Sequence, residues 1–151
     1  MRKIMIVDDN YLSAEGIEKN IDWEVLNAEI VHICYNGTSA IDAMKKEPVD
    51  LIISDIEMPD LDGISMSRQA LDINPMVKII LISAYDKFEY ARRALLLGAL
   101  DYIEKPLDYA YLIQKVKNAF ALMEREQKNL QLLKQSRPLL IRRLPIVSNL
   151  I

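Results

Sequence analysis

The sequence predicts an α/β fold, a doubly wound parallel sheet of five strands. Two observations carry this prediction. Short runs rich in Ile, Val and Leu recur along the chain, and a stretch of helical periodicity follows each one. Strands covered on both faces read as continuous apolar runs, as most of these do. The chain has 151 residues, of which 51% are hydrophobic, enough for one compact domain with its own core.

The five predicted strands are short and lie at 3–7, 29–33, 51–54, 78–83 and 99–103. Helical patterns follow them at 11–20, 37–46, 63–72, 87–96 and from 108 to about 135. The fourth pattern shows the spacing well, because Phe88, Ala91, Leu95 and Leu96 fall on one helical face. Gly, Pro and Asn mark the turns and helix ends, at Asn36-Gly37, Pro48, Met58-Pro59, Asp62-Gly63, Asn74-Pro75 and Gly98.

The last helical pattern extends beyond what a compact domain needs. Its positions follow a short, impure heptad through Val116, Phe120, Met123, Gln127 and Leu130. We expect Pro138 to end this helix, because proline lacks the N–H group and its ring clashes with the preceding turn. The sequence thus predicts a domain over 1–122 and a helical linker or tail over 123–151. Three interpretations of the tail stay open: a linker to a further domain, a dimerising arm, or a frayed end.

Charge and cysteine content indicate a cytoplasmic protein. The net charge is −3, divided into −7 over residues 1–120 and +4 over residues 121–151, so the acidic body is unsuited to binding nucleic acid itself. No apolar run approaches the roughly 20 residues of a membrane helix. The acidic pair Asp8-Asp9, which follows a very short apolar run, does not fit a signal peptide. The single cysteine, Cys34, fits a reducing compartment and a small buried residue.

Charged and polar side chains stand at the carboxyl ends of four predicted strands. They are Asp8 and Asp9 after the first, Asp55 after the third, Ser83 at the end of the fourth and Lys105 after the fifth. Because the carboxyl ends of parallel strands meet at one edge of a sheet, we expect these side chains to converge. Taken singly, each has a structural explanation as a helix cap, loop acid, turn residue or surface cation. Together, the acids repel one another unless a cation such as Mg²⁺ neutralises them.

Asp55 is the best candidate for a nucleophile, because it ends the central strand and faces both the acidic pair and Lys105. A carboxylate can attack phosphorus and form an aspartyl phosphate. A metal ion and an ammonium group neutralise the charge of the transferring phosphoryl group. A hydroxyl such as that of Ser83 can hydrogen-bond a phosphoryl oxygen once it is attached.

These residues resemble the receiver domain of two-component response regulators, the CheY-like family. The similarity covers about residues 2–122 and rests on four segments. They are Ile6-Val7-Asp8-Asp9, Ile53-Ser54-Asp55-Ile56-Glu57-Met58-Pro59 with Asp62-Gly63, Leu81-Ile82-Ser83-Ala84 and Asp101-Tyr102-Ile103-Glu104-Lys105-Pro106. Each segment alone is weak evidence, whereas the four together are specific. The resemblance implies a flavodoxin-like strand order of 2-1-3-4-5.

The resemblance also implies a role for each residue of the site. Asp55 is the implied phosphoacceptor. The implied Mg²⁺ ligands are Asp8, Asp9, Asp55 and the backbone carbonyl of Glu57. Ser83 is the implied switch hydroxyl, Lys105 the partner of the phosphoryl oxygens, and Tyr102 the aromatic that changes rotamer. The Lys105-Pro106 bond is implied to be cis, and Glu57 and Tyr85 to influence how long the phosphoryl group persists.

Some segments are similar to a narrower group, the receivers attached to AraC-type DNA-binding domains. These segments are 16–24, 83–91 and Arg137-Pro138-Leu139-Leu140. The similarity implies a helical linker that leads to a transcriptional output that binds DNA. Our hypothesis is that a sensor histidine kinase phosphorylates Asp55, and that the readout is either homodimerisation on phosphorylation or rearrangement of the linker. No helix-turn-helix fits in the 13 residues after Pro138, so that output is absent from this chain. We therefore expect a signalling switch rather than an enzyme.

Three other classes of protein fit the sequence less well than a receiver. Mg²⁺-dependent phosphatases or phosphotransferases with an aspartyl intermediate often carry Asp-x-Asp-x-Thr, whereas Asp55 begins Asp-Ile-Glu-Met-Pro here. A pseudo-receiver that acts without phosphorylation is disfavoured by the intact acids and Lys105. A nucleotide-binding protein is disfavoured because no Gly-rich loop follows the first strand.

Overall fold

A computed structural model describes residues 1–84 and 88–143. The strands are β1 (Arg2–Val7), β2 (Ala28–Cys34), β3 (Leu51–Asp55), β4 (Lys78–Ser83) and β5 (Asp101–Glu104). The helices are α1 (Tyr11–Asn20), α2 (Gly37–Lys46), α3 (Gly63–Ile73), α4 (Phe88–Leu97) and α5 (Tyr109–Arg143). By contacts the chain divides into two compact units, 1–117 and 118–151, which are described separately. Within the described residues, no helix has the length and apolar character needed to cross a membrane.

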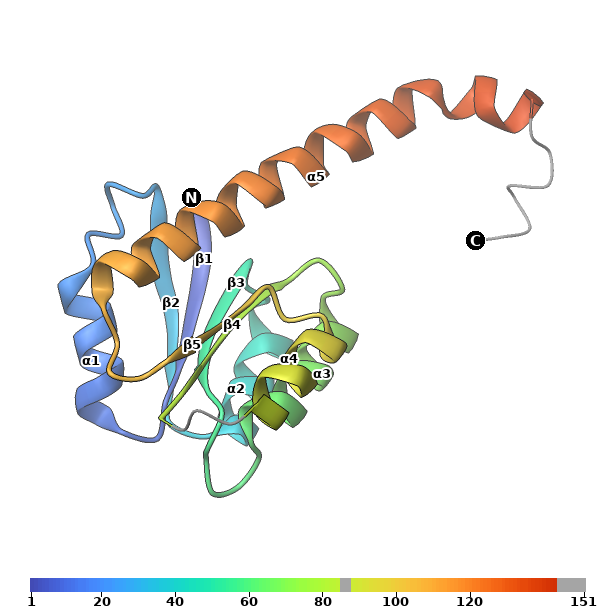
Figure 1. Cartoon of the computed structure of the whole chain (residues 1–151). Coiled ribbons are helices and arrows are strands. Elements are labelled where there is room, and N and C mark those ends of the chain that lie inside the picture. The colour runs from blue at the N-terminus through green and yellow to red at the C-terminus, as the bar shows by residue number, and fades with distance from the viewer. Residues whose placement is uncertain (85–87, 144–151) are drawn as a thin grey trace. The chain divides into compact units, whose positions relative to one another are not determined.

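The five strands form one parallel sheet in the order β2-β1-β3-β4-β5, so the predicted fold class is confirmed. In the first unit, α2, α3 and α4 lie on one face of the sheet, and α1 and the first turns of α5 lie on the other (Figure 1). β1, β3 and β4 occupy the centre, and nearly all of their residues are buried. The strand order reverses between β1 and β3, which places a crevice at their carboxyl ends.

Most predicted element bounds agree with the structure to within one residue, but two predictions were wrong. The last strand begins at Asp101 rather than at residue 99. The reason is that Ala99 N–H still bonds the carbonyl of Ala94 in α4, after Gly98 has adopted a φ of 97°. The helix therefore closes through a glycine in the left-handed region before the strand can start.

The second wrong prediction concerns the end of α5. The helix continues through Pro138 to Arg143 instead of ending there. Proline removes one N–H donor, which would otherwise bond the carbonyl of Lys134, but the backbone on either side can remain helical. The predicted tail residues 144–151 lie outside the described part of the chain, as does Tyr85.

Asn and Asp side chains cap four of the helices, α1, α2, α3 and α5; at α5 the Asp108 carboxylate accepts the N–H of Ala110 at 2.9 Å. The Asn10 carboxamide accepts the N–H groups of Leu12 and Ser13 at 2.9 and 3.2 Å. Asn36 caps α2 and Asp62 caps α3 in the same manner. The sequence left open whether Asp8, Asp9 or Asn10 caps α1. Because Asn10 does so, helix capping does not account for the two carboxylates before it.

The loop that joins β3 to α3 is held at both ends by close backbone packing. Gly63 N–H donates to the carbonyl of Ile56 at 2.8 Å, and a Cβ at Gly63 would lie 2.2 Å from the carbonyl oxygen of Asp55. Within the loop, Leu61 packs against Gly37 at the start of α2, where a Cβ would lie 2.5 Å from the Leu61 carbonyl oxygen. These approaches admit only glycine and fix the path of the loop.

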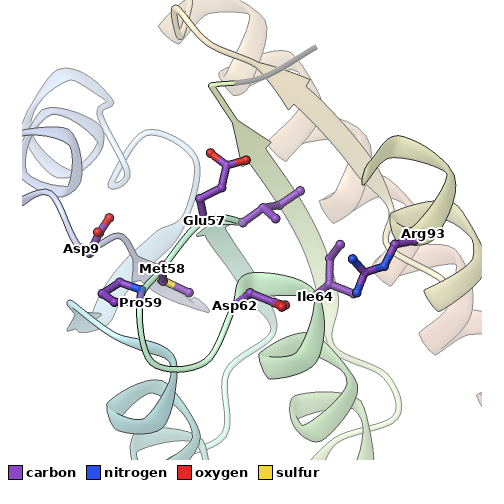
Figure 2. Close-up of a pocket in the computed structure, with 8 residues that line it drawn as sticks. Asp9, Glu57, Met58, Pro59, Asp62, Ile64 and Arg93 are labelled. Carbon is purple, nitrogen blue, oxygen red and sulfur yellow. The ribbon is translucent and has the colours of Figure 1, made fainter. Parts of the chain in front are cut away.

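This loop borders an open pocket of about 540 Å³ (Figure 2). The pocket is lined by Asp9, Ile56, Glu57, Met58, Pro59, Asp62, Ile64 and Arg93. The carboxyl end of β1, the β3–α3 loop and α4 thus enclose solvent-accessible space beside the end of the central strand.

Candidate functional site

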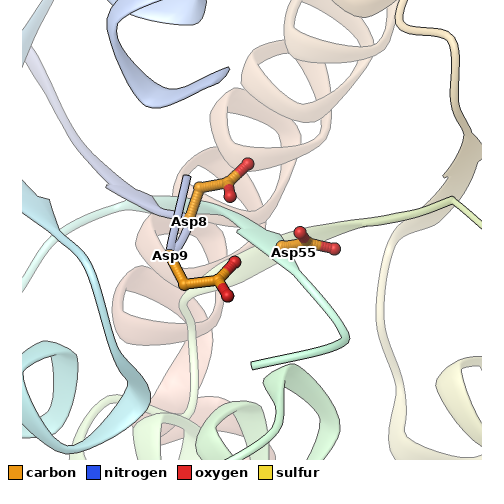
Figure 3. A group of neighbouring side chains, drawn as sticks. All are labelled: Asp8, Asp9 and Asp55. Atoms are coloured by element: carbon orange, nitrogen blue, oxygen red, sulfur yellow. The ribbon is translucent and has the colours of Figure 1, made fainter. Parts of the chain in front are cut away.

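Three carboxylates converge at the carboxyl ends of the central strands. Asp8 and Asp9 follow β1, Asp55 ends β3, and one ligand oxygen from each lies within 4.8 Å of the others (Figure 3). Asp8 and Asp55 are only 4% and 6% exposed, whereas Asp9 is exposed. Carboxylate oxygens at this spacing, open to solvent on the Asp9 side, suit a hard divalent cation that keeps some of its water ligands, as Mg²⁺ does.

Lys105 supplies the positive charge that faces these acids. Its Nζ lies 3.1 Å from Asp55 Oδ2 and 3.9 Å from Asp8 Oδ2. Asp55 Oδ1 accepts the N–H of Ile56 at 2.8 Å, so both of its carboxylate oxygens have a partner. One ammonium group therefore serves two buried acids, and the cluster keeps an excess of negative charge.

The pKa values reflect this shortage of positive charge. Burial raises the pKa of Asp8 to about 6, and the negative charge of Asp55 adds to the rise. Burial also raises the pKa of Asp55, although Lys105 acts in the opposite direction. Burial would lower the pKa of Lys105, but its hydrogen bond and attraction to Asp55 outweigh this and raise it. Because the pKa of each carboxyl is raised, a cation that binds beside the two groups stabilises their ionised forms.

Ser83, the predicted switch hydroxyl, contacts the side chain of Glu57. The sequence did not predict this contact. The Ser83 side chain is fully buried at the end of β4, and its Oγ donates to the Glu57 carboxylate at 2.7 Å. The family resemblance implies a ligand role only for the backbone carbonyl of Glu57. The sequence signal that could have indicated this contact was the position of Glu57, whose side chain is long and acidic, two residues after Asp55.

Tyr102 and Pro106 lie at a neighbouring part of the molecule. Tyr102 is half-buried on β5, packs against the core, and lines a cavity of about 330 Å³ together with Pro106 and Asp108. The Lys105-Pro106 peptide bond is cis. Glu104 and Pro106, the chain neighbours of Lys105, both line this cavity.

The remaining candidate groups do not belong to this site. Cys34 is buried, and burial raises the pKa of its thiol, which agrees with a structural residue rather than a nucleophile. His32 lies on β2, with its Nε2 2.9 Å from the carbonyl oxygen of Glu47. Within the described residues, the groups that could hold a metal at the carboxyl edge are the carboxylates of Asp8, Asp9 and Asp55.

This combination of fold and site matches a known family. Residues 4–117 match the model of the response regulator receiver domain. The chain therefore belongs to the receiver domains of two-component response regulators, and the family expected from the sequence is confirmed.

Curated relatives of the chain are bacterial regulatory proteins. The uncharacterized transcriptional regulatory protein YesN of Bacillus subtilis strain 168 is 29% identical over 126 residues, which cover 83% of this chain and 34% of YesN. The transcriptional regulatory protein HptR of Staphylococcus aureus strain NCTC 8325 is 32% identical over 114 residues, 74% of this chain and 44% of HptR. The chain thus spans between a third and a half of the length of these relatives.

Solved structures agree in fold and subfamily. The receiver domain of AraT, a response regulator from Geobacillus stearothermophilus, superposes with a TM-score of 0.78 at 34% identity, covering 83% of this chain and 98% of that one. A two-component transcriptional regulator AraC from Clostridium phytofermentans gives 0.75 at 29% identity, covering 85% and 99%. The resemblance to receivers of AraC-type regulators is thereby confirmed.

Proposed function

We propose that Asp55 accepts a phosphoryl group from a sensor histidine kinase, and that this modification switches a transcriptional output elsewhere in the full protein. One observation carries the proposal. The carboxylate that ends β3 touches Lys105 and lies within ligand distance of Asp8 and Asp9. This arrangement supplies a nucleophile, a cationic partner and the ligands of a divalent cation in one place.

In the proposed transfer, an oxygen of Asp55 forms a bond to phosphorus while the bond from phosphorus to the kinase imidazole nitrogen breaks. The imidazole takes the electron pair, and Asp55 becomes an acyl phosphate. Asp8, Asp9, Asp55 and the carbonyl of Glu57 are the proposed ligands of Mg²⁺, which supplies charge neutralisation at the phosphoryl oxygens. Lys105 pairs with a phosphoryl oxygen from the opposite side, and the Ser83 hydroxyl donates to another.

The partners follow from the same proposal. The kinase is the phosphoryl donor, and Ser83, Lys105 and Tyr102 transmit the change to α4, β5 and α5. We propose a receiver domain over 1–122 and a linker over 123–151, with homodimerisation on phosphorylation and DNA bound only through an output domain. We propose that the protein is cytoplasmic, as is typical of switches that are phosphorylated by sensor kinases. We propose that the chain is not a phosphatase of other substrates. At most, it catalyses its own phosphorylation from small donors and its own dephosphorylation.

Intact mass spectrometry tests the assignment of Asp55. The full chain is incubated with Mg²⁺ and acetyl phosphate, alongside Asp55→Asn and the control Asp42→Asn, which changes an exposed acid on α2. We expect a gain of one phosphoryl group in the wild type and the control, and none in Asp55→Asn. An adduct that persists in Asp55→Asn excludes this phosphoacceptor, and no adduct in any protein favours a pseudo-receiver.

Sizing chromatography of the chain before and after phosphorylation tests the proposed dimerisation. A chain that elutes as a monomer in both states contradicts it.

A further inference from the structure

We propose that the carboxylate of Glu57 competes with the phosphoryl group for the Ser83 hydroxyl, and so favours the unphosphorylated arrangement of the switch. The inference rests on the proposed function of Asp55 and Ser83. It assigns a role to the Glu57 side chain, which is distinct from the backbone carbonyl proposed as a metal ligand. Glu57 is thus a positioning residue, because it acts on phosphorylation through Ser83.

The geometry brings the two side chains together from neighbouring strands. Glu57 stands two residues after Asp55 on the β3–α3 loop, and Ser83 ends β4, where the preceding residue Ile82 pairs with Asp55. Ser83 is fully buried, Glu57 is half-buried, and their oxygens lie 2.7 Å apart. Hydrogen bonds from a hydroxyl to a carboxylate are stronger than those between neutral groups, and burial strengthens them further.

Competition follows from the chemistry of a hydroxyl group. Serine carries one hydroxyl hydrogen and can donate it to one acceptor in a direct bond. To donate to a phosphoryl oxygen on Asp55, Ser83 must release Glu57, which then needs water or another donor. The free energy gained from the new hydrogen bond is therefore reduced by the one that is lost. Only the difference in free energy between these two hydrogen bonds shifts the equilibrium between the two arrangements of the switch.

The charge of Glu57 gives a second effect that must be separated from this one. A carboxylate beside Asp55 repels an incoming phosphoryl group whether or not Ser83 is present. Removal of Glu57 eliminates both effects, whereas removal in a Ser83→Ala background eliminates only the repulsion. A double-mutant cycle isolates the contribution that depends on the hydroxyl.

The test measures how tightly beryllium fluoride with Mg²⁺, a stable mimic of the phosphoryl group, binds the full chain. Titration calorimetry compares the wild type, Glu57→Ala, Ser83→Ala and the double variant. We expect Glu57→Ala to tighten binding by a factor about 10 times larger in the Ser83 background than in the Ser83→Ala background. Glu57→Gln, which removes the charge but keeps an acceptor oxygen, should fall between the wild type and Glu57→Ala. Equal factors in both backgrounds overturn the competition and leave repulsion alone.

A second measurement needs neither Mg²⁺ nor the mimic. Urea unfolding of the same four proteins gives the coupling between the two side chains in the free chain, and we expect the pair to be stabilising. A coupling of zero overturns the proposal. The proposed function fails differently: beryllium fluoride would then bind no variant, or would bind Asp55→Asn as well as the wild type.

Discussion

The two ends of the sheet both carry charged residues. At the amino end an acid and a base form a pair, whereas at the carboxyl end two buried acids share one base. At the amino end, Lys3 and Glu47 form a one-to-one pair at 2.9 Å, and both side chains are more than 40% exposed. The hydrogen bond between them raises the pKa of Lys3 and lowers that of Glu47, so each partner favours the charged form of the other. At the carboxyl end, Asp8 and Asp55 are buried and share one lysine, and the pKa of each acid is raised.

The difference shows which end is built for binding. A balanced exposed pair gains nothing from a further ion, whereas a buried cluster with excess negative charge is stabilised by any cation that fits. Burial of ionised carboxylates with too few cations costs free energy at the carboxyl end, which indicates a binding function there. The exposed Lys3–Glu47 pair carries no such cost.

The largest expected effect comes from removing one acid of the carboxyl end. Asp8→Asn should weaken Mg²⁺ binding by more than the roughly 10- to 100-fold that accompanies loss of a hydrogen-bonding partner of a metal ligand. Titration calorimetry at pH 7 gives the affinity, with Asp42→Asn as the matched control on α2. Wild-type affinity in Asp8→Asn would remove Asp8 from the ligand set.

Glycine substitutions compare the backbone at the two ends. Gly63→Ala should destabilise the chain by about 3 kcal/mol, because the new Cβ would meet the Asp55 carbonyl oxygen at 2.2 Å. Gly98→Ala, at the amino end, meets no atom within 4 Å and should cost only about 1 kcal/mol, from its φ of 97°. Urea unfolding measures both values. Equal losses would show that steric packing under Asp55 is no tighter than elsewhere.

The ligand-free chain should also show the charge imbalance in its response to pH. The pKa of Asp8 is about 6 in the folded state and near the ordinary aspartate value of 3.8 in the unfolded state, so the folded chain holds this proton more tightly. Stability from this group is greatest below pH 4 and falls as the pH rises to 6, by about 1–3 kcal/mol. Asp8→Asn should therefore gain stability relative to the wild type over that range. A difference that does not vary between pH 4 and pH 7 would contradict the raised pKa.

The smallest effect is expected at the amino end. Lys3→Ala should leave the urea midpoint, Mg²⁺ affinity and phosphorylation of the chain close to wild-type values, because an exposed ion pair contributes little. If Lys3→Ala changes phosphorylation as much as Lys105→Ala does, the contrast between the two ends is wrong.

The sequence predicted those parts of the fold that have strong local signals. The bounds of α1 and α2 were predicted correctly, because Asn10 and Asn36 cap them and the apolar spacing is regular. The start of β5 was placed two residues too early, because Ala99 is apolar like a strand residue yet bonds back into α4. Pro138 was given a helix-ending role that the backbone of α5 does not bear out. At β5 the hydrogen bond of a single backbone N–H group decided the outcome, and composition does not encode it.

The candidate site divides in the same way. The convergence of Asp8, Asp9, Asp55 and Lys105 was predictable, because parallel strands end at one edge and the residues follow those ends directly. The contact between Glu57 and Ser83 was not predictable, since it depends on the path of a loop and on one side-chain rotamer. The unequal burial of Asp8 and Asp9, adjacent in the chain, likewise required the packing of the surrounding elements.

The glycines that anchor the β3–α3 loop have a consequence for the entropy of binding. Gly63 packs against Asp55 and so brings the two ends of the loop together. Within the loop, Leu61 packs against Gly37 of α2, and the Thr38 hydroxyl donates to Asp60. A loop fixed in this way loses its conformational freedom when the chain folds, and has little left to lose when a cation or a phosphoryl group arrives. The Glu57 carbonyl would thus be preorganised for the ligand role proposed above, and the proposed response to phosphorylation would fall to side chains such as those of Glu57 and Ser83.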